Sequence, residues 1–434
     1  MDTRIAEVRA WEALDSRGSP TVACEVRLRG GARGAAVVPS GASRGSHEAL
    51  ELRDGGGRYG GLSVRRAVDN ARGVLGPAVR GLDAADQRHL DAVLREADGT
   101  PGLSRLGANA VLAVSIASAL AAADGEGVPR YRWFGEGAAP LLPLPMVNVL
   151  SGRAHGGAVD LQDFLVVPVG AATFAEALEW SWRVRRATAE LAAARGLPAR
   201  LVADEGGLGP PLPSNREALD LLEAGIERSG LRPGHEAAIA IDVAATQLLA
   251  GRRYLLASEQ RALEAEELLA ELASWCDAYP IVSLEDPFAE DDWEAWALAT
   301  AELGDRLQLL GDDLLVTSLA RLERAIGTGV ANAVLVKPNQ AGTLSDAFAV
   351  LARAREARYA TVVSARSGES EDAWLADLAV GWRAGQIKVG SLTRGERTAK
   401  WNRLLAIEAE LGADAAFAGR AAVASRHGRD QASR

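Results

Sequence analysis

The chain has 434 residues, of which 48% are hydrophobic and 24% are charged, and this composition excludes collagen-like, disordered and small disulfide-stapled proteins. The formal net charge of −10 argues against binding to a nucleic-acid backbone, because such proteins usually present a basic face. Cys24 and Cys276 lie far apart in the chain and offer neither a disulfide framework nor a thiolate metal site. Only three of the 48 basic residues are lysine (Lys337, Lys388 and Lys400), so each lysine calls for an explanation.

The N-terminal part of the chain predicts a small α+β domain. Residues 21–28 alternate apolar and polar side chains between glycine-rich turns, which is typical of antiparallel strands. Apolar residues at three- and four-residue spacing then predict helices over residues 64–79, 84–97 and 107–123. The glycine- and proline-rich run 135–145 predicts a linker, so we assign residues 1–137 to a capping domain.

The sequence predicts neither export nor membrane insertion. Residues 1–5 contain no apolar signal core, and the longest largely apolar stretch, residues 110–123, is shorter than the ~20 residues of a membrane span. Together with the scarcity of cysteine, this predicts a cytoplasmic protein.

Residues 138–420 predict an α/β barrel, because short apolar strands alternate with alanine-rich helices. The expected strands are 200–202, 237–241, 281–284, 307–310, 333–336, 361–363 and 386–387. A chargeable residue follows almost every strand, and in a barrel such side chains meet at the rim where active sites lie. An open doubly wound sheet is the competing architecture, but no glycine-rich dinucleotide fingerprint follows a first strand. Residues 421–434 are expected to form a frayed tail.

Three residues at the expected strand ends, Asp242, Glu285 and Asp312, form a hard oxygen cluster suited to Mg²⁺. Lys337 and Lys388 follow on later strand ends, and an ammonium close to divalent cations loses its proton more readily than a guanidinium. The alternative interpretation is a carboxylate cluster neutralised by arginine. Arginine has replaced lysine almost everywhere else in the chain. We therefore expect these two lysines to be retained because an amine, unlike a guanidinium, can lose its proton near neutral pH, whereas the lysine near the C-terminus is expected to be structural.

Nine longer motifs resemble those of the enolase family and span the chain to about residue 420. They are DSRGSPT (15–21), PSGASRG (39–45), EALELRD (48–54), LGANA (106–110), DEGG (204–207), SLEDPF (283–288), GDDL (311–314), KPNQ (337–340) and GQIK (385–388). The resemblance implies a small N-terminal α+β domain and a (β/α)8 barrel whose first units are irregular. It also implies a Mg²⁺-dependent hydro-lyase that converts 2-phosphoglycerate to phosphoenolpyruvate, with two Mg²⁺ per site.

The resemblance gives each site position a role. The expected ligands of a first Mg²⁺ are Asp242, Glu285 and Asp312, and Ser43 on a mobile loop is expected to help hold a second. The expected catalytic residues are Lys337 as the base for the C2 proton, Lys388 as its partner, Glu205 as the acid for the departing hydroxyl, Asp163 and His155. The expected substrate-binding residues are Gln162, Ser364, Arg366 and Ser367, with Arg366, Ser367 and His155 at the phosphate end.

Four positions depart from the family pattern. Ala365 replaces the histidine of the Ser-His-Arg-Ser-Gly-Glu motif, and Asp163 shortens the glutamate of the Gln-Glu-Phe motif by one methylene, roughly 1.5 Å. Arg44 and Arg153 stand near the phosphate end, where the family has threonine and a small residue. The set predicts a pocket rebuilt for a bulkier or more anionic substrate; the alternative is that both arginines point to solvent.

A chain with such a pocket resembles carboxyphosphonoenolpyruvate synthase, an enolase paralogue that acts in phosphonate and phosphinate natural-product (antibiotic) pathways. The substrate is then a small anionic phosphate or phosphonate, either 2-phosphoglycerate or its carboxyphosphono analogue. Racemisation is a second enzyme hypothesis, but it needs no leaving-group acid such as Glu205. An inactive paralogue that serves as a scaffold is the non-enzyme alternative, and retention of the metal carboxylates and both lysines counts against it.

Association with a second copy is the remaining expectation. Enolase dimers resemble one another in having arginine–glutamate pairs between the two subunits. At three of those charged positions this chain has Trp11, Ala23 and Ala406. Because apolar packing can replace an ion pair without loss of stability, this predicts a homodimer or higher homo-oligomer with an apolar interface, and a monomer is the alternative. No nucleic-acid or membrane partner is expected.

Overall fold

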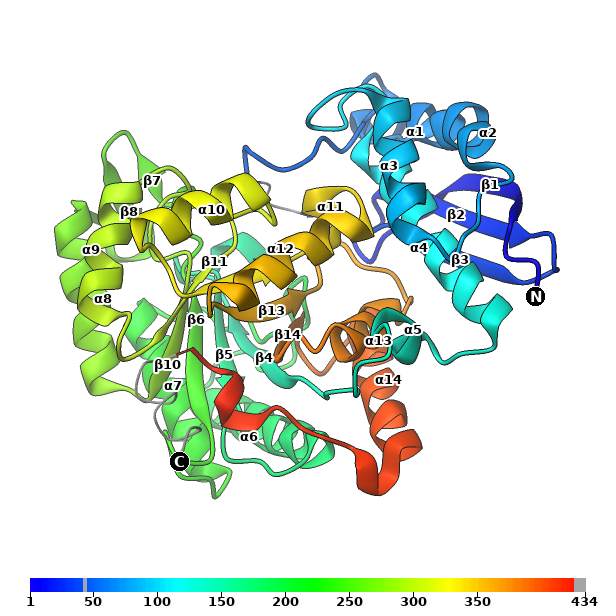
Figure 1. The fold of residues 1–434 in the computed structure, drawn as a ribbon. Helices are drawn as coiled ribbons and strands as arrows, with labels where there is room; N and C mark the ends of the chain where they lie inside the picture. Colours follow the sequence, from blue (N-terminus) through cyan, green and yellow to red (C-terminus); the bar gives the residue numbers. More distant parts are fainter. Residues whose placement is uncertain (42–44, 425–434) are drawn as a thin grey trace.

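The computed structural model describes residues 1–41 and 45–424 and shows a small domain beside a larger barrel (Figure 1). The small domain contains a three-stranded antiparallel sheet of order β1–β2–β3. Its elements are β1 (Ile5–Leu14), β2 (Pro20–Leu28), β3 (Arg33–Val37), α1 (Arg65–Asn70), the π-helical turn η2 (Ala71–Leu75), α2 (Gly76–Val79), α3 (Gln87–Asp98), α4 (Ala108–Glu126) and α5 (Arg130–Phe134). The predicted strands and helices are present, and the first predicted helix is divided into three consecutive pieces, α1, η2 and α2.

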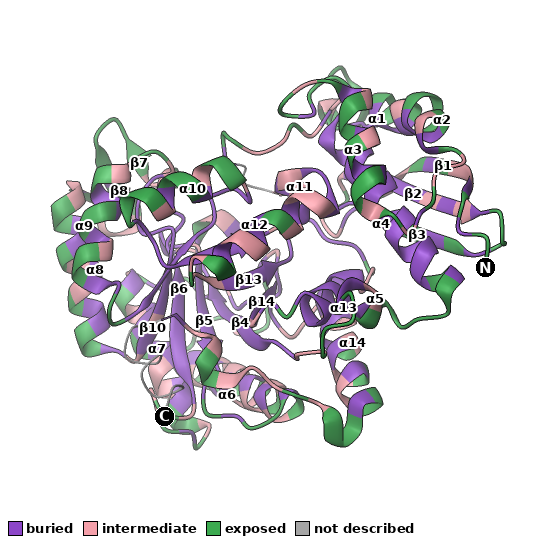
Figure 2. Cartoon of the chain, viewed as in Figure 1, coloured by how far each residue is buried: buried purple, intermediate pink, exposed green. Residues whose placement is uncertain are grey.

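Helix α4 packs against the sheet of the small domain and is buried along nearly its whole length (Figure 2). A Cβ atom at Gly34 would lie 2.2 Å from both Ala117 O and Ala121 N, so glycine is what allows β3 and α4 to approach so closely. Helix α4 is long and apolar enough to cross a membrane, but 94% of its most apolar window is buried inside the protein. This burial is the pattern of a core helix.

The large domain is a closed eight-stranded barrel, which confirms the predicted fold class and excludes the open sheet. Its strands are β4 (Leu144–Ser151), β5 (Asp163–Val167), β6 (Ala238–Asp242), β10 (Ile281–Glu285), β11 (Gln308–Gly311), β12 (Ala333–Val336), β13 (Ala360–Ser364) and β14 (Gln386–Gly390). Strand β5 runs antiparallel to both β4 and β6, while all other neighbours pair in parallel. The first units of the barrel are therefore irregular, as the resemblance implied.

Helices surround the barrel, and its strands are buried (Figure 2). The helices are α6 (Phe174–Ala194), α7 (Asn215–Arg228), α8 (Ala265–Ala278), α9 (Trp293–Leu303), α10 (Leu319–Thr328), α11 (Pro338–Ala341), α12 (Leu344–Glu356), α13 (Trp374–Gly381) and α14 (Gly395–Leu411). A small antiparallel sheet of β7 (Leu249–Ala250), β8 (Arg253–Leu256) and β9 (Arg261–Leu263) lies between β6 and α8 in the chain.

The prediction of a strand at residues 200–202 was wrong, because Val202 makes only an isolated bridge to Leu208. Strands β4 and β5 were not predicted. Strand β4 starts at Leu144 inside the expected linker, and its second residue is Pro145, a residue that ordinarily argues against a strand. Strand β5 is buried at every position and shows no alternation of polar and apolar residues.

The segment 421–424 lies against the N-terminal ends of the barrel strands. The carbonyl oxygen of Ala422 accepts a hydrogen bond from Gln386 Nε2 at 2.9 Å, and the N–H of Ala424 donates to Gln308 Oε1 at 3.2 Å. These four residues of the expected tail therefore close the bottom of the barrel, and the rest of that tail lies outside the described residues.

Candidate active site

The three carboxylates predicted to bind Mg²⁺ and the two lysines predicted to be catalytic meet at the C-terminal rim of the barrel. Asp242 and Glu285 end β6 and β10, Asp312 and Lys337 directly follow β11 and β12, and Lys388 lies in β14. Lys388 Nζ donates to Asp242 Oδ2 and to Glu285 Oε2, both at 2.6 Å, while Lys337 Nζ donates to Asp312 Oδ2. All five side chains are at most 12% exposed, so the structure brings them into one buried cluster.

The charges of this cluster hold both lysines protonated. Burial alone would lower the pKa of Lys337, but the charges of Asp312 and Glu285 together outweigh burial and raise the pKa above its ordinary value. The same balance, with Asp242 and Glu285 as the carboxylates, raises the pKa of Lys388 well above the usual range. Burial and the nearby Asp242 raise the pKa of the Glu285 carboxyl in turn. An amine that acts as a base here therefore requires relief from the neighbouring carboxylate charge.

The three carboxylates are chemically suited to a divalent cation, but they are not one of the two groups of described residues whose ligand atoms lie within 4.8 Å of one another. They supply hard oxygen donors only, and Glu285 Oε1 is buried without a hydrogen-bond partner in the described part of the chain. Two amides orient the outer carboxylates, since Gln162 Nε2 donates to Asp242 Oδ2 at 2.8 Å and Gln340 Nε2 donates to Asp312 Oδ1 at 2.9 Å. Asp312 also belongs to a second acidic group, with Asp286 and Asp313, whose carboxylate oxygens lie within 4.8 Å of one another.

Asp286 positions the segment that carries Asp312, a function that the sequence did not reveal. Its Oδ1 accepts the N–H of Asp312 at 3.0 Å and its Oδ2 accepts the N–H of Asp313 at 2.7 Å. The side chain is 2% exposed, so both backbone donors depend on it for a partner.

Replacing Asp286 by asparagine is expected to destabilise the protein by about 1–3 kcal/mol, because the amide can accept only one of the two N–H groups and leaves the other unpaired. Urea denaturation measures this loss, and the exposed Asp69→Asn serves as the control. An unchanged free energy of unfolding in Asp286→Asn would contradict the positioning role.

A second buried group on the same side of the barrel consists of His155, Asp163 and Glu205. His155 Nε2 lies 3.6 Å from Asp163 Oδ2 and 3.9 Å from Glu205 Oε1, and Asp163 Oδ1 accepts from Ser151 Oγ at 2.9 Å. Both ring nitrogens of His155 are buried without a hydrogen-bond partner among the described residues. The three side chains face one another, so the structure also unites this part of the predicted site.

The two carboxyl groups of this trio differ in how they hold a proton. Burial raises the pKa of Asp163 to about 7, in spite of the opposing charge of His155. Burial also acts on Glu205, but the positive charges of Arg397 and His155 outweigh it and lower the pKa. Near neutral pH, therefore, Asp163 retains a proton more readily than Glu205.

The raised pKa of Asp163 predicts a pH dependence of stability in the cation-free protein. Between about pH 3.8 and 7 the folded state holds a proton that the unfolded state releases, so stability falls as pH rises through this window. In Asp163→Asn we expect a smaller fall in the free energy of unfolding between pH 5 and 8, measured by urea denaturation in EDTA. A fall as large as that of the unchanged protein would refute the assignment.

Of the residues expected at the phosphate end, Arg366 and Ser367 lie in the loop after β13, whereas His155 lies with Asp163 and Glu205. Arg366 Nη1 lies 3.0 Å from Glu48 Oε2, and its Nη2 lies 3.1 Å from Glu48 Oε1, so the guanidinium is oriented by a carboxylate of the small domain. Ser367 is buried, and Ser364 Oγ donates to the carbonyl of Ala365 at 2.9 Å. Ala365 is itself 7% exposed and occupies a buried position beside Arg366.

Two cations of α14 support this loop from behind, and the sequence motifs gave neither a specific role. Arg397 is fully buried and donates to the carbonyls of Arg366 at 2.7 Å and Ser367 at 2.6 Å. Lys400 Nζ lies 2.9 Å from Glu369 Oε2 and outside the carboxylate cluster. A charged residue on the same helix face as the apolar residues Trp401, Leu404 and Ile407 is the sequence signal that could have found both.

Arg153 is a predicted site residue that the structure does not bring into the buried clusters. Arg153 is 53% exposed and its Nη2 lies 3.4 Å from Asp160 Oδ1, so it occupies the rim of a separate cavity of about 400 Å³ that Gln162 also lines. Ser43 and Arg44 lie outside the described residues.

A closed barrel with buried carboxylates and lysines at its C-terminal rim is the arrangement of a barrel enzyme whose rim residues could hold a cation and move protons. Residues 139–426 match the enolase C-terminal TIM barrel domain, and residues 5–134 match the enolase N-terminal domain. The chain therefore belongs to the enolase family, whose members are lyases that typically use Mg²⁺.

Proposed function

We propose that this protein is a Mg²⁺-dependent hydro-lyase that removes water from a 2-phosphoglycerate-like acid and leaves an enolpyruvate. The observation that carries the proposal is the buried arrangement in which Lys337 contacts Asp312 while Lys388 contacts both Asp242 and Glu285. Of the two basic residue types, only lysine can lose its proton and serve as a base near neutral pH, and both lysines of the cluster lie against carboxylates whose oxygens suit a divalent cation.

In this proposal Lys337 removes the C2 proton and Lys388 pairs with the substrate carboxylate. Asp242, Glu285 and Asp312 would hold the Mg²⁺, which when bound would offset their charge and stabilise the negative charge that develops on the substrate. Without that offset Lys337 stays protonated, because Asp312 and Glu285 raise its pKa. The base and the cation are therefore required together.

Departure of the C3 hydroxyl needs a proton from the other buried group. We assign the acid role to Glu205, with Asp163 as the source of its proton: the pKa of Glu205 is lowered, so near neutral pH the proton of this group rests on Asp163, whose pKa is about 7. His155 lies within 4 Å of both carboxylates and links them. A second Mg²⁺ with Ser43 as a ligand is part of the proposal, although Ser43 lies outside the described residues.

The substrate is either 2-phosphoglycerate or its carboxyphosphono analogue. Ala365 favours the analogue, because it replaces an imidazole by a methyl group beside Arg366 and leaves more room there. Arg153 adds no support, since its charge lies against Asp160 and half of its side chain is exposed. Absorbance at 240 nm after adding 2-phosphoglycerate and Mg²⁺ separates the two: robust turnover supports 2-phosphoglycerate, and turnover of the analogue alone supports the phosphonate.

We further propose that the protein is a cytoplasmic homodimer. Trp11 and Leu14 are 43% and 54% exposed on the sheet of the small domain, and Ala406 is exposed on α14, which supports an apolar contact between copies. Ala23 is fully buried within one chain, so it contributes no surface to such a contact. Sedimentation at micromolar concentration is expected to show a dimer, and a species of one-chain mass alone would overturn this.

A further inference from the structure

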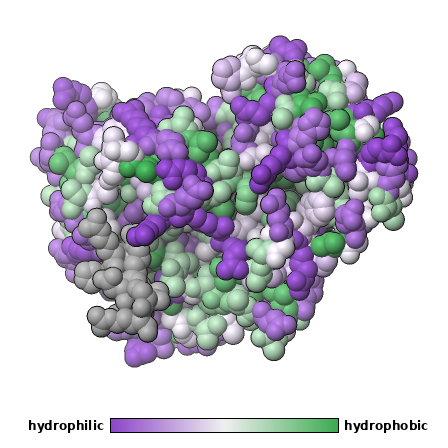
Figure 3. Space-filling model, in the orientation of Figure 1, coloured by the Kyte–Doolittle hydropathy of each residue, from purple (hydrophilic) through white to green (hydrophobic). Residues whose placement is uncertain are grey.

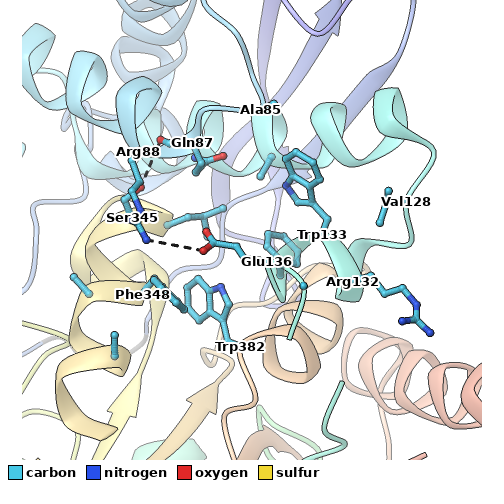
Figure 4. A pocket seen from close by; sticks show the side chains of 16 residues that line it. Ala85, Gln87, Arg88, Val128, Arg132, Trp133, Glu136, Ser345, Phe348 and Trp382 are labelled. Carbon is cyan, nitrogen blue, oxygen red and sulfur yellow. Dashed lines mark hydrogen bonds and ion pairs between the residues drawn. The ribbon is translucent and has the colours of Figure 1, made fainter. Parts of the chain in front are cut away.

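The two domains meet in two different ways. Helices α3, α4 and α5 on one side, and α12 and the end of α13 on the other, enclose an apolar cavity of about 860 Å³ with aromatic rings in its walls (Figure 4). Figure 3 shows apolar residues in the hollow between the domains on this face. At the rim of the barrel the contact is polar, because Glu48 accepts from Arg366 at 3.0 Å and from Gln340 at 3.4 Å. Gln340 extends this contact into the carboxylate cluster, since its Nε2 also donates to Asp312 at 2.9 Å.

A short turn after β11 has its backbone in the left-handed region. Val316 has a φ of 40° and Thr317 a φ of 49°. Both side chains are buried and branch at Cβ, and such residues rarely adopt a positive φ, so the turn is strained. The turn starts at Asp312, whose carbonyl accepts the N–H of Val316 at 2.7 Å. Strain of this kind persists only where the surrounding structure holds it, and it is concentrated at functional sites.

The Thr317 hydroxyl lies at the centre of a chain of hydrogen bonds. Its oxygen accepts the backbone N–H of Lys337 at 2.9 Å and lies 2.7 Å from Gln340 Oε1. Both acceptors of the Gln340 NH₂ group are carboxylates, which only accept, so Gln340 Oε1 is the atom that faces Thr317. The hydroxyl therefore donates to Gln340 while it accepts from Lys337. Its other neighbour, the carbonyl of Leu335, lies farther away at 3.4 Å.

Two parts of the proposed active site are linked through this one hydroxyl. Lys337 carries the amine assigned as the base, and Asp312 is one of the carboxylates expected to hold Mg²⁺. In the ranges that the structure describes, Thr317 makes no hydrogen bond to the Asp312 side chain, so its effect on that carboxylate passes through Gln340. Replacing a residue that orients a metal ligand in this way typically costs about 10–100-fold in metal affinity or activity.

We propose that Thr317 is a positioning residue, which sets the Asp312 carboxylate and the backbone of Lys337 in place for the cation and the base. This inference rests on the proposed function, because it concerns the same site. The strained turn places the hydroxyl where it can donate and accept at once. Valine has the same shape but can do neither, so without the hydroxyl the Gln340 amide is free to turn its oxygen toward Asp312.

Thr317→Val tests the inference by isothermal titration calorimetry of the full chain with Mg²⁺ alone. We expect its Mg²⁺ affinity, and its exchange of the substrate C2 proton, each to fall at least about ten-fold. Thr317→Ser keeps the hydroxyl and is expected to retain the Mg²⁺ affinity of the unchanged protein. Thr361→Val is the matched control, because the Thr361 hydroxyl is also buried but donates to the carbonyl of Ala384 at 2.6 Å, and we expect its Mg²⁺ affinity to be unchanged.

A second variant tests whether Thr317 acts through Gln340. Gln340→Met removes the amide and is expected to weaken Mg²⁺ binding at least about ten-fold. The double variant of Thr317→Val and Gln340→Met should bind Mg²⁺ no more weakly than Gln340→Met alone, because the two residues act on Asp312 as one unit.

Unchanged Mg²⁺ affinity in a folded Thr317→Val protein, an equal loss in Thr317→Ser, or losses that add in the double variant would overturn the inference. If Thr317→Val does not fold, Gln340→Met decides, and unchanged affinity in that variant overturns the inference. Mg²⁺ binding without C2 exchange in the unchanged protein would refute the proposed function alone, since calorimetry needs no turnover. An unchanged protein that binds no Mg²⁺ would refute both.

Discussion

Lys337→Arg is expected to lose exchange of the substrate C2 proton while the fold and the cation site persist. Arginine keeps the positive charge beside Asp312, but a guanidinium does not give up its proton near neutral pH. A positioned general base contributes roughly 10²–10⁴-fold, so exchange in D₂O with Mg²⁺, followed by NMR, should fall by at least about 100-fold.

The control for Lys337→Arg is the increase in melting temperature that Mg²⁺ causes in the variant and in the unchanged protein. Because Asp242, Glu285 and Asp312 are unchanged in the variant, Mg²⁺ should still raise its melting temperature. Exchange within ten-fold of the unchanged protein would remove Lys337 from the role of base.

Lys388→Met is expected to lower the stability of the cation-free protein by about 3–5 kcal/mol. The substitution leaves Asp242 and Glu285 buried next to each other without the ammonium that lies 2.6 Å from both. Mg²⁺ should restore much of the loss, because a divalent cation can replace the missing positive charge between the two carboxylates. Urea denaturation in EDTA and in Mg²⁺ measures both effects.

Lys400→Met is the matched control for this experiment. Lys400 is also buried and contacts a carboxylate, Glu369, but it lies outside the proposed cation site. We expect Lys400→Met to be destabilised as well, with no specific recovery in Mg²⁺. The same response to Mg²⁺ in Lys388→Met and Lys400→Met would argue against a cation between Asp242 and Glu285.

The sequence predicted the main cluster because strand ends of a parallel barrel meet at one rim. Asp242, Glu285, Asp312 and Lys337 each end or directly follow an apolar strand, so their convergence needs only the fold class and the spacing. Strand β5 escaped prediction because a strand buried on both faces has no alternation to detect.

Other parts of the site depend on contacts that no local pattern records. Arg366 is oriented by Glu48 of the small domain, 318 residues away, and such a pair follows only from how the two domains pack. Arg153 was expected at the phosphate end, but in the structure it lies against Asp160, because loop geometry decides which acidic neighbour an arginine reaches. The burial of Ala23 depends likewise on packing of the sheet and not on its sequence position.

In the proposed reaction, Lys337 abstracts a proton from C2 of a 2-phosphoglycerate-like acid within the cluster of buried carboxylates. Incubation of the unchanged protein in D₂O with Mg²⁺ and either 2-phosphoglycerate or the carboxyphosphono analogue, followed by NMR, tests it most directly. We predict deuterium at C2 of at least one substrate, dependent on Mg²⁺ and on Lys337. Absence of exchange with both substrates would contradict the proposed reaction and favour an inactive scaffold.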